Sequence, residues 1–201
     1  FPPLTNAYDL FREGREAAAF EIVKHHAAAR APDAIFTLAD MYWRGAGIEQ
    51  DYARARELFG AAADVGQPMA VRAYTNLLAT VIGRSREWTR ALARLESEAR
   101  IDGLRAKMLT VIRTMQIDRN GDPLAVPPPE ELSKEPGVWL FRRAFSDAEC
   151  EFLKLLAEPT YERSLVKMEG KDVPDPIRTS DGSTIHWLIE DPATHAITRR
   201  L

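Results

Sequence analysis

A pattern of apolar and small residues recurs at an interval of 36 residues within the first half of the chain. Moving the sequence by this interval places small residues on small residues and large apolar residues on large apolar residues. The matched pairs are Ala34 with Ala70, Leu38 with Tyr74, Tyr42 with Leu78, Gly47 with Gly83, Tyr52 with Trp88, Ala55 with Ala91, and Phe59 with Leu95. A period of this length, with small residues where helices would touch, is typical of a helical solenoid. We therefore predict a mainly α fold that begins with an α-helical repeat superhelix.

The clearest copy of the pattern spans residues 34–69. Apolar residues recur at helical spacing in both halves of this copy, around Leu38 and Tyr42 in the first half and around Phe59 in the second. The glycines between the two halves free the backbone to leave the first helix, and Asp51 is placed to cap the second. The copy therefore reads as one complete helix–turn–helix unit.

This central copy resembles a Sel-one-like repeat, a relative of the tetratricopeptide repeat with a slightly longer loop. The matching residues are Leu38-Ala-Asp-Met-Tyr42, the Gly45-x-Gly47-Ile turn, Asp51-Tyr52, Ala55, Ala61-Ala62 and Gly66. The next copy departs from the pattern, with Val81 at the position of Gly45 and Glu98 at the position of Ala62. The resemblance implies a groove along the repeats that receives a protein or peptide partner.

The remaining residues up to 120 fit the same repeat domain. Residues 7–30 are rich in Ala and Glu and predict the helices of a first, irregular repeat. A further repeat follows over 70–102, and 104–117 predicts one more helix that covers the open end of the solenoid. Asn120-Gly121 ends this helix, so we assign residues 1–120 to the repeat domain.

The composition changes abruptly after residue 120, where prolines cluster. Pro127, Pro128 and Pro129 cannot continue a helix, because each proline lacks an amide donor and fixes its own φ. We interpret 121–136 as a semi-rigid, proline-rich linker between two units.

The last part of the chain, 137–201, predicts an incomplete α+β unit. A β-forming run at 138–141 precedes a helix that opens with a capping box, in which Ser146 and Glu149 satisfy each other's backbone amides. We expect a strand over 161–168, a polar loop over 169–175, and a final helix that begins after Asp191-Pro192.

The order of these elements resembles the opening of a prolyl 4-hydroxylase-like Fe(II)- and 2-oxoglutarate-dependent dioxygenase domain, whose fold is a double-stranded β-helix. The resemblance covers about 136–201. It rests on the helix opening Phe145-Ser-Asp-Ala-Glu-Cys150, the segment Arg178-Thr179-Ser180 with Gly182, and the helix near 194–201. In that family the segment with Arg178, Thr179 and Ser180 lies near the substrate groove, so the resemblance implies a substrate-binding role for these three residues.

The resemblance also implies Fe(II) and 2-oxoglutarate, with ascorbate as a further candidate, for a full-length protein that hydroxylates a peptidyl side chain. Iron binding in that family needs a His-x-Asp and a distant His, which come later in the family's sequence. This chain contains no His-x-Asp or His-x-Glu. We therefore predict no catalytic, metal or cofactor-binding residue within it and no activity of the chain alone. The alternative is a non-catalytic protein–protein interaction scaffold built on the repeats.

Other residues with chemical potential have structural interpretations that we favour. His25 and His26 are adjacent and would point about 100° apart on a helix. His186 and His195 lack an acidic residue at ligand spacing. The remaining candidates are a basic stripe at Arg86, Arg90 and Arg94 that reads as a solvated face, packing residues at Trp43 and Trp88, and a buried thiol at Cys150.

Composition excludes several classes of protein. The net charge is −3, with the acidic excess after residue 120, and this does not suggest the basic surface of a nucleic-acid-binding protein. The sequence has no apolar run of membrane-spanning length. A single cysteine precludes an internal disulfide framework and favours a reducing compartment, so we expect a cytoplasmic protein without nucleic-acid or membrane partners.

Overall fold

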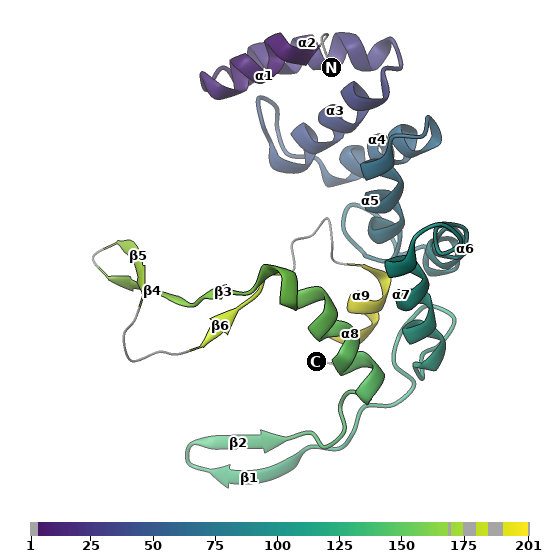
Figure 1. Ribbon diagram of the computed structural model, residues 1–201, viewed down its shortest axis with the longest axis vertical. Helices are drawn as coiled ribbons and strands as arrows, with labels where there is room; N and C mark the ends of the chain where they lie inside the picture. The colour runs from purple at the N-terminus through teal and green to yellow at the C-terminus, as the bar shows by residue number, and fades with distance from the viewer. Residues whose placement is uncertain (1–3, 169, 175–179, 185–190, 201) are drawn as a thin grey trace. The chain divides into compact units, whose positions relative to one another are not determined.

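The computed structural model describes residues 4–168, 170–174, 180–184 and 191–200, and the fold is reported for these residues (Figure 1). The chain is mainly helical, with a few short antiparallel strands, as the sequence predicts. It divides into two compact units, Phe1–Leu95 and Glu96–Leu201. The proline-rich segment 121–136 lies inside the second unit, between α7 and α8.

The regular elements of the first unit, over its described residues, are helices. They are α1 (Thr5–Arg12), α2 (Glu16–Ala28), α3 (Pro32–Arg44), α4 (Tyr52–Asp64), α5 (Pro68–Leu78) and the start of α6 (Trp88–Glu98). From α1 to α5, each helix packs against the next one in the sequence (Figure 1).

The starts of these helices keep the interval found in the sequence. α2, α4 and α6 begin at Glu16, Tyr52 and Trp88, which are 36 residues apart, and α3 and α5 begin at Pro32 and Pro68 with the same separation. Proline is favoured in the first turn of a helix because its missing amide hydrogen would have no partner there. The recurrence in the sequence thus marks helix starts in the structure.

The caps explain where the central helices begin and end. The Asp51 side chain accepts a hydrogen bond from the Arg54 backbone N–H at 2.9 Å, which confirms the predicted cap of α4. Gly45 ends α3 with φ of 72°, in the left-handed region that glycine enters at low cost. The predicted turn between α3 and α4 is therefore present.

Two loop glycines make equivalent contacts in successive copies. A β-carbon on Gly47 would lie 2.4 Å from the carbonyl oxygen of Glu16, and one on Gly83 would lie 2.6 Å from that of Tyr52. Glu16 and Tyr52 are the first residues of α2 and α4. Each glycine thus allows its loop to contact the start of the second helix in the preceding copy.

The core of the first unit contains the small residues that the repeat pattern singles out. Ala55 and Ala91 are fully buried, as expected where helices approach closely. Trp43 and Trp88 are also buried, and the Trp43 ring packs edge-to-face on Tyr52 with centroids 4.8 Å apart. The prediction that both tryptophans are packing residues is confirmed.

One core position is charged. Arg56, in α4, is 2% exposed, and its guanidinium donates to the carbonyl oxygens of Arg84 and Ser85 at 3.3 and 3.2 Å. It also donates to Glu87 Oε1 at 2.9 Å. Burial lowers the pKa of Arg56, and this effect outweighs the opposing influence of Glu87. The side chain anchors the loop between α5 and α6 from inside the unit.

The second unit combines helices with short hairpins. Its elements are the end of α6, α7 (Gly103–Thr114), β1 (Glu130–Lys134), β2 (Gly137–Leu140), α8 (Asp147–Ala157), the 3₁₀ helix η2 (Glu158–Thr160), β3 (Glu162–Arg163), β4 (Leu165–Met168), β5 (Lys171–Pro174), β6 (Asp181–Gly182) and α9 (Pro192–Thr198). Both α8 and α9 pack against α7.

The strands form three separate antiparallel pairs: β1 with β2, β3 with β6, and β4 with β5. The predicted strand at 138–141 corresponds to β2. The expectation of a polar loop over 169–175 is wrong, because this segment contains β5. The proposed linker 121–136 contains β1, which pairs with β2. Both strands are rich in charged residues, and β1 is mostly exposed, so neither shows an apolar pattern in the sequence.

The termini of α8 and α9 are capped as the sequence predicts. Ser146 accepts from the Glu149 N–H while the Glu149 carboxylate accepts from the Ser146 N–H at 2.7 Å, which completes the capping box. Asp191 caps α9 by accepting from the Thr194 N–H at 2.9 Å. Cys150 is half-buried, so the prediction of a buried thiol holds only in part.

Candidate functional site

A groove in the first unit is the strongest candidate site. It has a volume of about 430 Å³ and is formed by α2, α3 and α4 with the turn that follows α2; we call it the α2–α4 groove. Its apolar lining consists of Ala27, Ala28, Ile35, Leu38, Leu58 and Ala61. Leu58 is half-buried and packs against the core, so the floor of the groove is continuous with the interior. Such a floor can receive aliphatic side chains.

The charged residues of this groove are mostly basic. Lys24, Arg30 and Arg54 line it together with Asp64, and all four are exposed. Within the described residues, Arg30 has no ion-pair partner. Lys24 and Arg54 pair with Glu21 and Glu57 at 3.6 and 3.0 Å, but neither glutamate lines the groove.

Arg30 holds an uncommon backbone conformation. Its φ is 60°, in the left-handed region, at the turn that ends α2. The Arg30 N–H donates to Ala27 O at 2.9 Å and the next N–H donates to His26 O, the pattern of a Schellman turn. The equivalent residue 36 positions later is Gly66, with φ of 81°. An arginine therefore occupies a site where the next copy has glycine.

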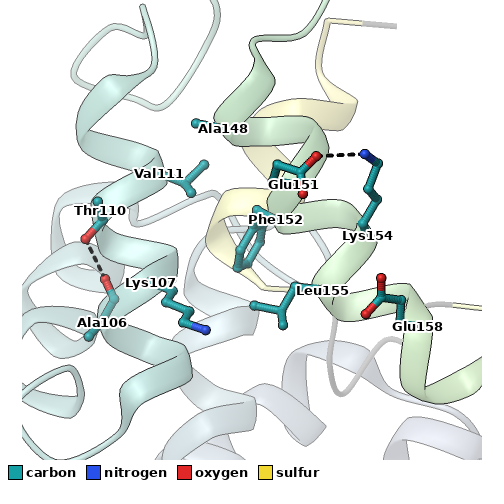
Figure 2. A pocket seen from close by; sticks show the side chains of 10 residues that line it. All are labelled: Ala106, Lys107, Thr110, Val111, Ala148, Glu151, Phe152, Lys154, Leu155 and Glu158. Carbon is teal, nitrogen blue, oxygen red and sulfur yellow. Dashed lines mark hydrogen bonds and ion pairs between the residues drawn. The ribbon is translucent and has the colours of Figure 1, made fainter.

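A second groove, in the second unit, lies between α7 and α8 and has a volume of about 540 Å³. Figure 2 shows Phe152 and Leu155 of α8 directed toward α7. Two lysines and two glutamates also line it, and Lys154 pairs with Glu151 at 2.7 Å. Its charges balance, so it selects no charged ligand.

Two buried ions of the second unit, Glu149 and Arg200, are paired with each other. The Arg200 guanidinium forms a two-pronged ion pair with Glu149, which is 1% exposed, and also donates to Ala144 O at 3.3 Å. Burial acts to raise the pKa of Glu149, but the hydrogen bonds from Arg200 and from the Ser146 amide hold it below its usual value. This arrangement serves structure, because the carboxylate has its partners within the unit.

The substrate-binding residues predicted from the dioxygenase resemblance are only partly described. Arg178 and Thr179 lie outside the described residues. Ser180 is exposed, and its carbonyl accepts from the Ser164 N–H at 3.1 Å beside the β3–β6 pair. Ser180 lines neither of the two grooves above. Its substrate role stays a prediction.

The histidines do not form a metal site among the described residues. His25 and His26 lie on α2 with ring centroids 5.6 Å apart, and His195 is half-buried in α9, whereas His186 lies outside the described residues. In that described part, no group of three or more His, Cys, Asp or Glu side chains could hold a metal ion. The described residues do not fit an Fe(II) site, so no catalytic step is assigned to them.

Of the predicted basic stripe, Arg90 and Arg94 lie on α6 and Arg86 precedes it; Arg90 is exposed, as expected for a solvated face, whereas Arg94 is half-buried. Arg90 pairs with Glu87 at 3.0 Å and lies 5.3 Å from the centre of the Tyr74 ring, while Arg94 lies 5.0 Å from the same ring. Arg94 also donates to the Thr75 hydroxyl at 3.0 Å. Cation–π contacts of this kind fix the side chains against α5.

Comparison with protein-family models, with characterised proteins and with solved structures gave no match. The two family resemblances therefore rest on the motifs quoted from the sequence. Among the helices that the structure describes, none is both long and apolar enough to cross a membrane.

The charged residues of the α2–α4 groove were not predicted from the sequence. The available signal was Arg30, which falls on Gly66 when the repeat is aligned on itself. A residue type that is costly at a turn position can mark a functional position.

Proposed function

We propose that the first unit belongs to a Sel-one-like helical solenoid, assigned to residues 1–120, that binds a protein or peptide partner in the α2–α4 groove. The observation that carries this proposal is the return of helix starts and loop contacts at 36 residues, with Gly47 on Glu16 and Gly83 on Tyr52. Stacked repeats of this kind form extended surfaces that bind other chains. The aliphatic floor of the groove supplies a place for an anchoring side chain.

For the second unit, we propose that 137–201 is the N-terminal portion of a prolyl 4-hydroxylase-like dioxygenase domain. The order β2, α8, the short hairpins and α9 is compatible with that resemblance. Fe(II) and 2-oxoglutarate, with ascorbate as a further candidate, would then act in the full-length protein, where they supply the oxidation of a peptidyl substrate. The repeats would hold the substrate protein, and Arg178, Thr179 and Ser180 would lie on the substrate side.

The second candidate function is a non-catalytic interaction scaffold. It is favoured by the absence of a metal-binding cluster in the described residues and of a His-x-Asp anywhere in the chain. Both candidates share the binding role of the groove. We also infer a cytoplasmic location from the single cysteine.

The binding role is tested by selecting peptides from a random dodecapeptide display library on the purified chain. Ala61→Trp places a bulky side chain in the groove at an exposed helix position. The selected peptides should lose binding to this variant. They should keep it with Ala93→Trp, a matched change at an exposed position of α6 that does not line the groove.

The catalytic hypothesis needs the full-length protein. We expect its reading frame to continue past Leu201 into a His-x-Asp, a later His and a nearby Lys or Arg. We also expect that protein to consume 2-oxoglutarate in an Fe(II)-dependent way when a selected peptide or its parent protein is present. A frame that lacks these residues favours the scaffold.

A further inference from the structure

We infer that the α2–α4 groove receives an acidic peptide segment that carries at least one aliphatic side chain. This inference rests on the peptide-binding role proposed above and specifies the chemistry of the partner. Three properties of the groove lead to it: the sign of its lining charges, the conformation of Arg30, and its aliphatic floor.

The lining charges favour an anionic partner. Three basic side chains, Lys24, Arg30 and Arg54, face a single acidic one, Asp64. The existing ion pairs of Lys24 and Arg54 are solvent-exposed and therefore weak, so a partner carboxylate can compete for both cations. Arg30 makes no ion pair with any residue that the structure describes, so its guanidinium is available for a two-pronged contact with a carboxylate.

The backbone conformation of Arg30 supports a role of this residue in binding rather than in folding. An L-residue with a side chain is disfavoured in the left-handed region, and glycine is the low-cost choice at the end of a helix. The next copy has Gly66 at this position, with the same pair of turn hydrogen bonds. Arginine at this position adds nothing that the turn needs, but it places a cation on the lining of the groove.

The floor of the groove adds an apolar requirement. Ile35 and Leu38 are less than one-tenth exposed, and Leu58 is half-buried, so an aliphatic side chain placed on them would leave water. The α7–α8 groove has a comparable apolar lining, but its two lysines and two glutamates select no sign of charge. The α2–α4 groove therefore combines an apolar contact with a preference for negative charge.

The test selects dodecapeptides from a random display library on the full chain, with counter-selection against Ala61→Trp, in which the groove is blocked. We expect the enriched peptides to carry more Asp and Glu than Lys and Arg, together with a Leu, Ile or Val. The affinity of the best peptide, followed by fluorescence anisotropy, should fall as salt is added because its contacts are ionic and exposed.

Substitutions in the groove separate binding from folding. Arg30→Gly should lower the affinity for the selected peptide by about tenfold, the effect of losing one charge-assisted contact. It should not lower the melting temperature of the protein. Arg30→Lys keeps the charge but cannot make the two-pronged contact, so its affinity should lie between those of the parent chain and Arg30→Gly. Asp64→Asn removes the one acidic lining residue and should strengthen binding. Arg44→Ala, which removes an exposed cation that does not line the groove, is the control and should leave binding unchanged.

The outcomes distinguish this inference from the function on which it rests. Enriched peptides that are neutral or basic, or that bind Arg30→Gly as tightly as the parent chain, would overturn the acidic-partner inference and leave peptide binding intact. If no peptide bound the parent chain better than it bound Ala61→Trp, both the acidic-partner inference and the proposed peptide-binding function would be overturned.

Discussion

Gly83 lies so close to Tyr52 that a β-carbon added to it would approach the Tyr52 carbonyl oxygen to 2.6 Å. Its φ of 75° is also one that residues with side chains avoid. Gly47 has the same relationship with Glu16, one repeat interval earlier. The contact is therefore a repeated feature of the first unit.

We predict that Gly83→Ala destabilises the protein by about 3 kcal/mol or more, because it combines a strained φ with a backbone overlap that cannot be relieved by a rotamer change. Gly14→Ala is the matched control, since Gly14 has φ of 71° but nothing within 4 Å of an added β-carbon. It should cost only about 1 kcal/mol. Urea unfolding of both variants measures the difference. Equal losses of unfolding free energy in the two variants would mean that the loop with Gly83 does not contact the start of α4 closely.

Arg56 provides a second prediction. Arg56→Met removes the donor to the loop carbonyls of Arg84 and Ser85 and also removes the buried ion-pair partner of Glu87. We expect a loss of roughly 2–4 kcal/mol in the free energy of unfolding. We also expect faster hydrogen exchange in the loop between α5 and α6.

The control for Arg56 lies on the same helix. Arg54→Ala removes an exposed pair with Glu57, and its effect should stay below about 1 kcal/mol. If Arg56→Met were as mild as Arg54→Ala, the buried guanidinium would not be what holds the loop.

Asp191 makes the stability of the second unit depend on pH. Burial raises the pKa of Asp191 to about 6, against hydrogen bonds from the start of α9 and the charge of Arg105, which act to lower it. Because the folded pKa exceeds the value of 3.8 for a free carboxyl, the folded protein binds a proton that the unfolded protein releases. Stability should therefore fall as the pH rises from about 4 to about 6 and remain lower above that range.

Asp191→Asn should abolish this dependence, because asparagine caps a helix well and carries no charge. At pH 7.5 the variant should be more stable than the parent chain by on the order of 2 kcal/mol, and at pH 4 the two should match. Asp51→Asn, at the exposed cap of α4, is the control; it keeps Asp191 and should therefore show the same fall in stability between pH 4 and pH 6 as the parent chain. Thermal unfolding across pH 4–8 measures both. An Asp191→Asn variant that is less stable at pH 7.5 would contradict this assignment.

The ion pair between Glu149 and Arg200 acts in the opposite direction. The pKa of Glu149 is lower in the folded protein than the unfolded value of 4.5. Its contribution to folding stability is therefore fully present above pH 4.5 and is lost as the pH falls through the folded pKa. Glu149→Gln should cost about 3–5 kcal/mol at pH 7, because it leaves a largely buried guanidinium without its anion.

A double-mutant cycle isolates this pair. Glu149→Gln combined with Arg200→Met should be less destabilising than the two single losses added together. The exposed pair of Glu151 and Lys154 on α8 is the comparison, with an expected coupling of about 1 kcal/mol or less. Strict additivity at Glu149 and Arg200 would show that the two side chains do not stabilise each other.

Local rules were enough to predict much of the helical part. A helix start depends on residues within one turn, so Asp51, Ser146 and Asp191 could be recognised as caps before any contact was known. The small residues at the 36-residue interval likewise indicated close helix contacts, and Ala55 and Ala91 are fully buried. The strands were harder to predict, because β1 and β5 are short and polar and are stabilised by pairing with a neighbour rather than by an apolar face.

The sequence by itself determined the helix starts, the repeat interval and the caps, because these depend on backbone preferences of neighbouring residues. Only the tertiary structure decided that Arg56 is buried, that Glu149 meets Arg200, and that Lys24, Arg30 and Arg54 line one groove. Each of these sets joins residues from elements that are far apart in the sequence. A sequence does not show whether a charged side chain faces water or a buried partner. Only the packing of the folded chain decides whether water is excluded from that side chain.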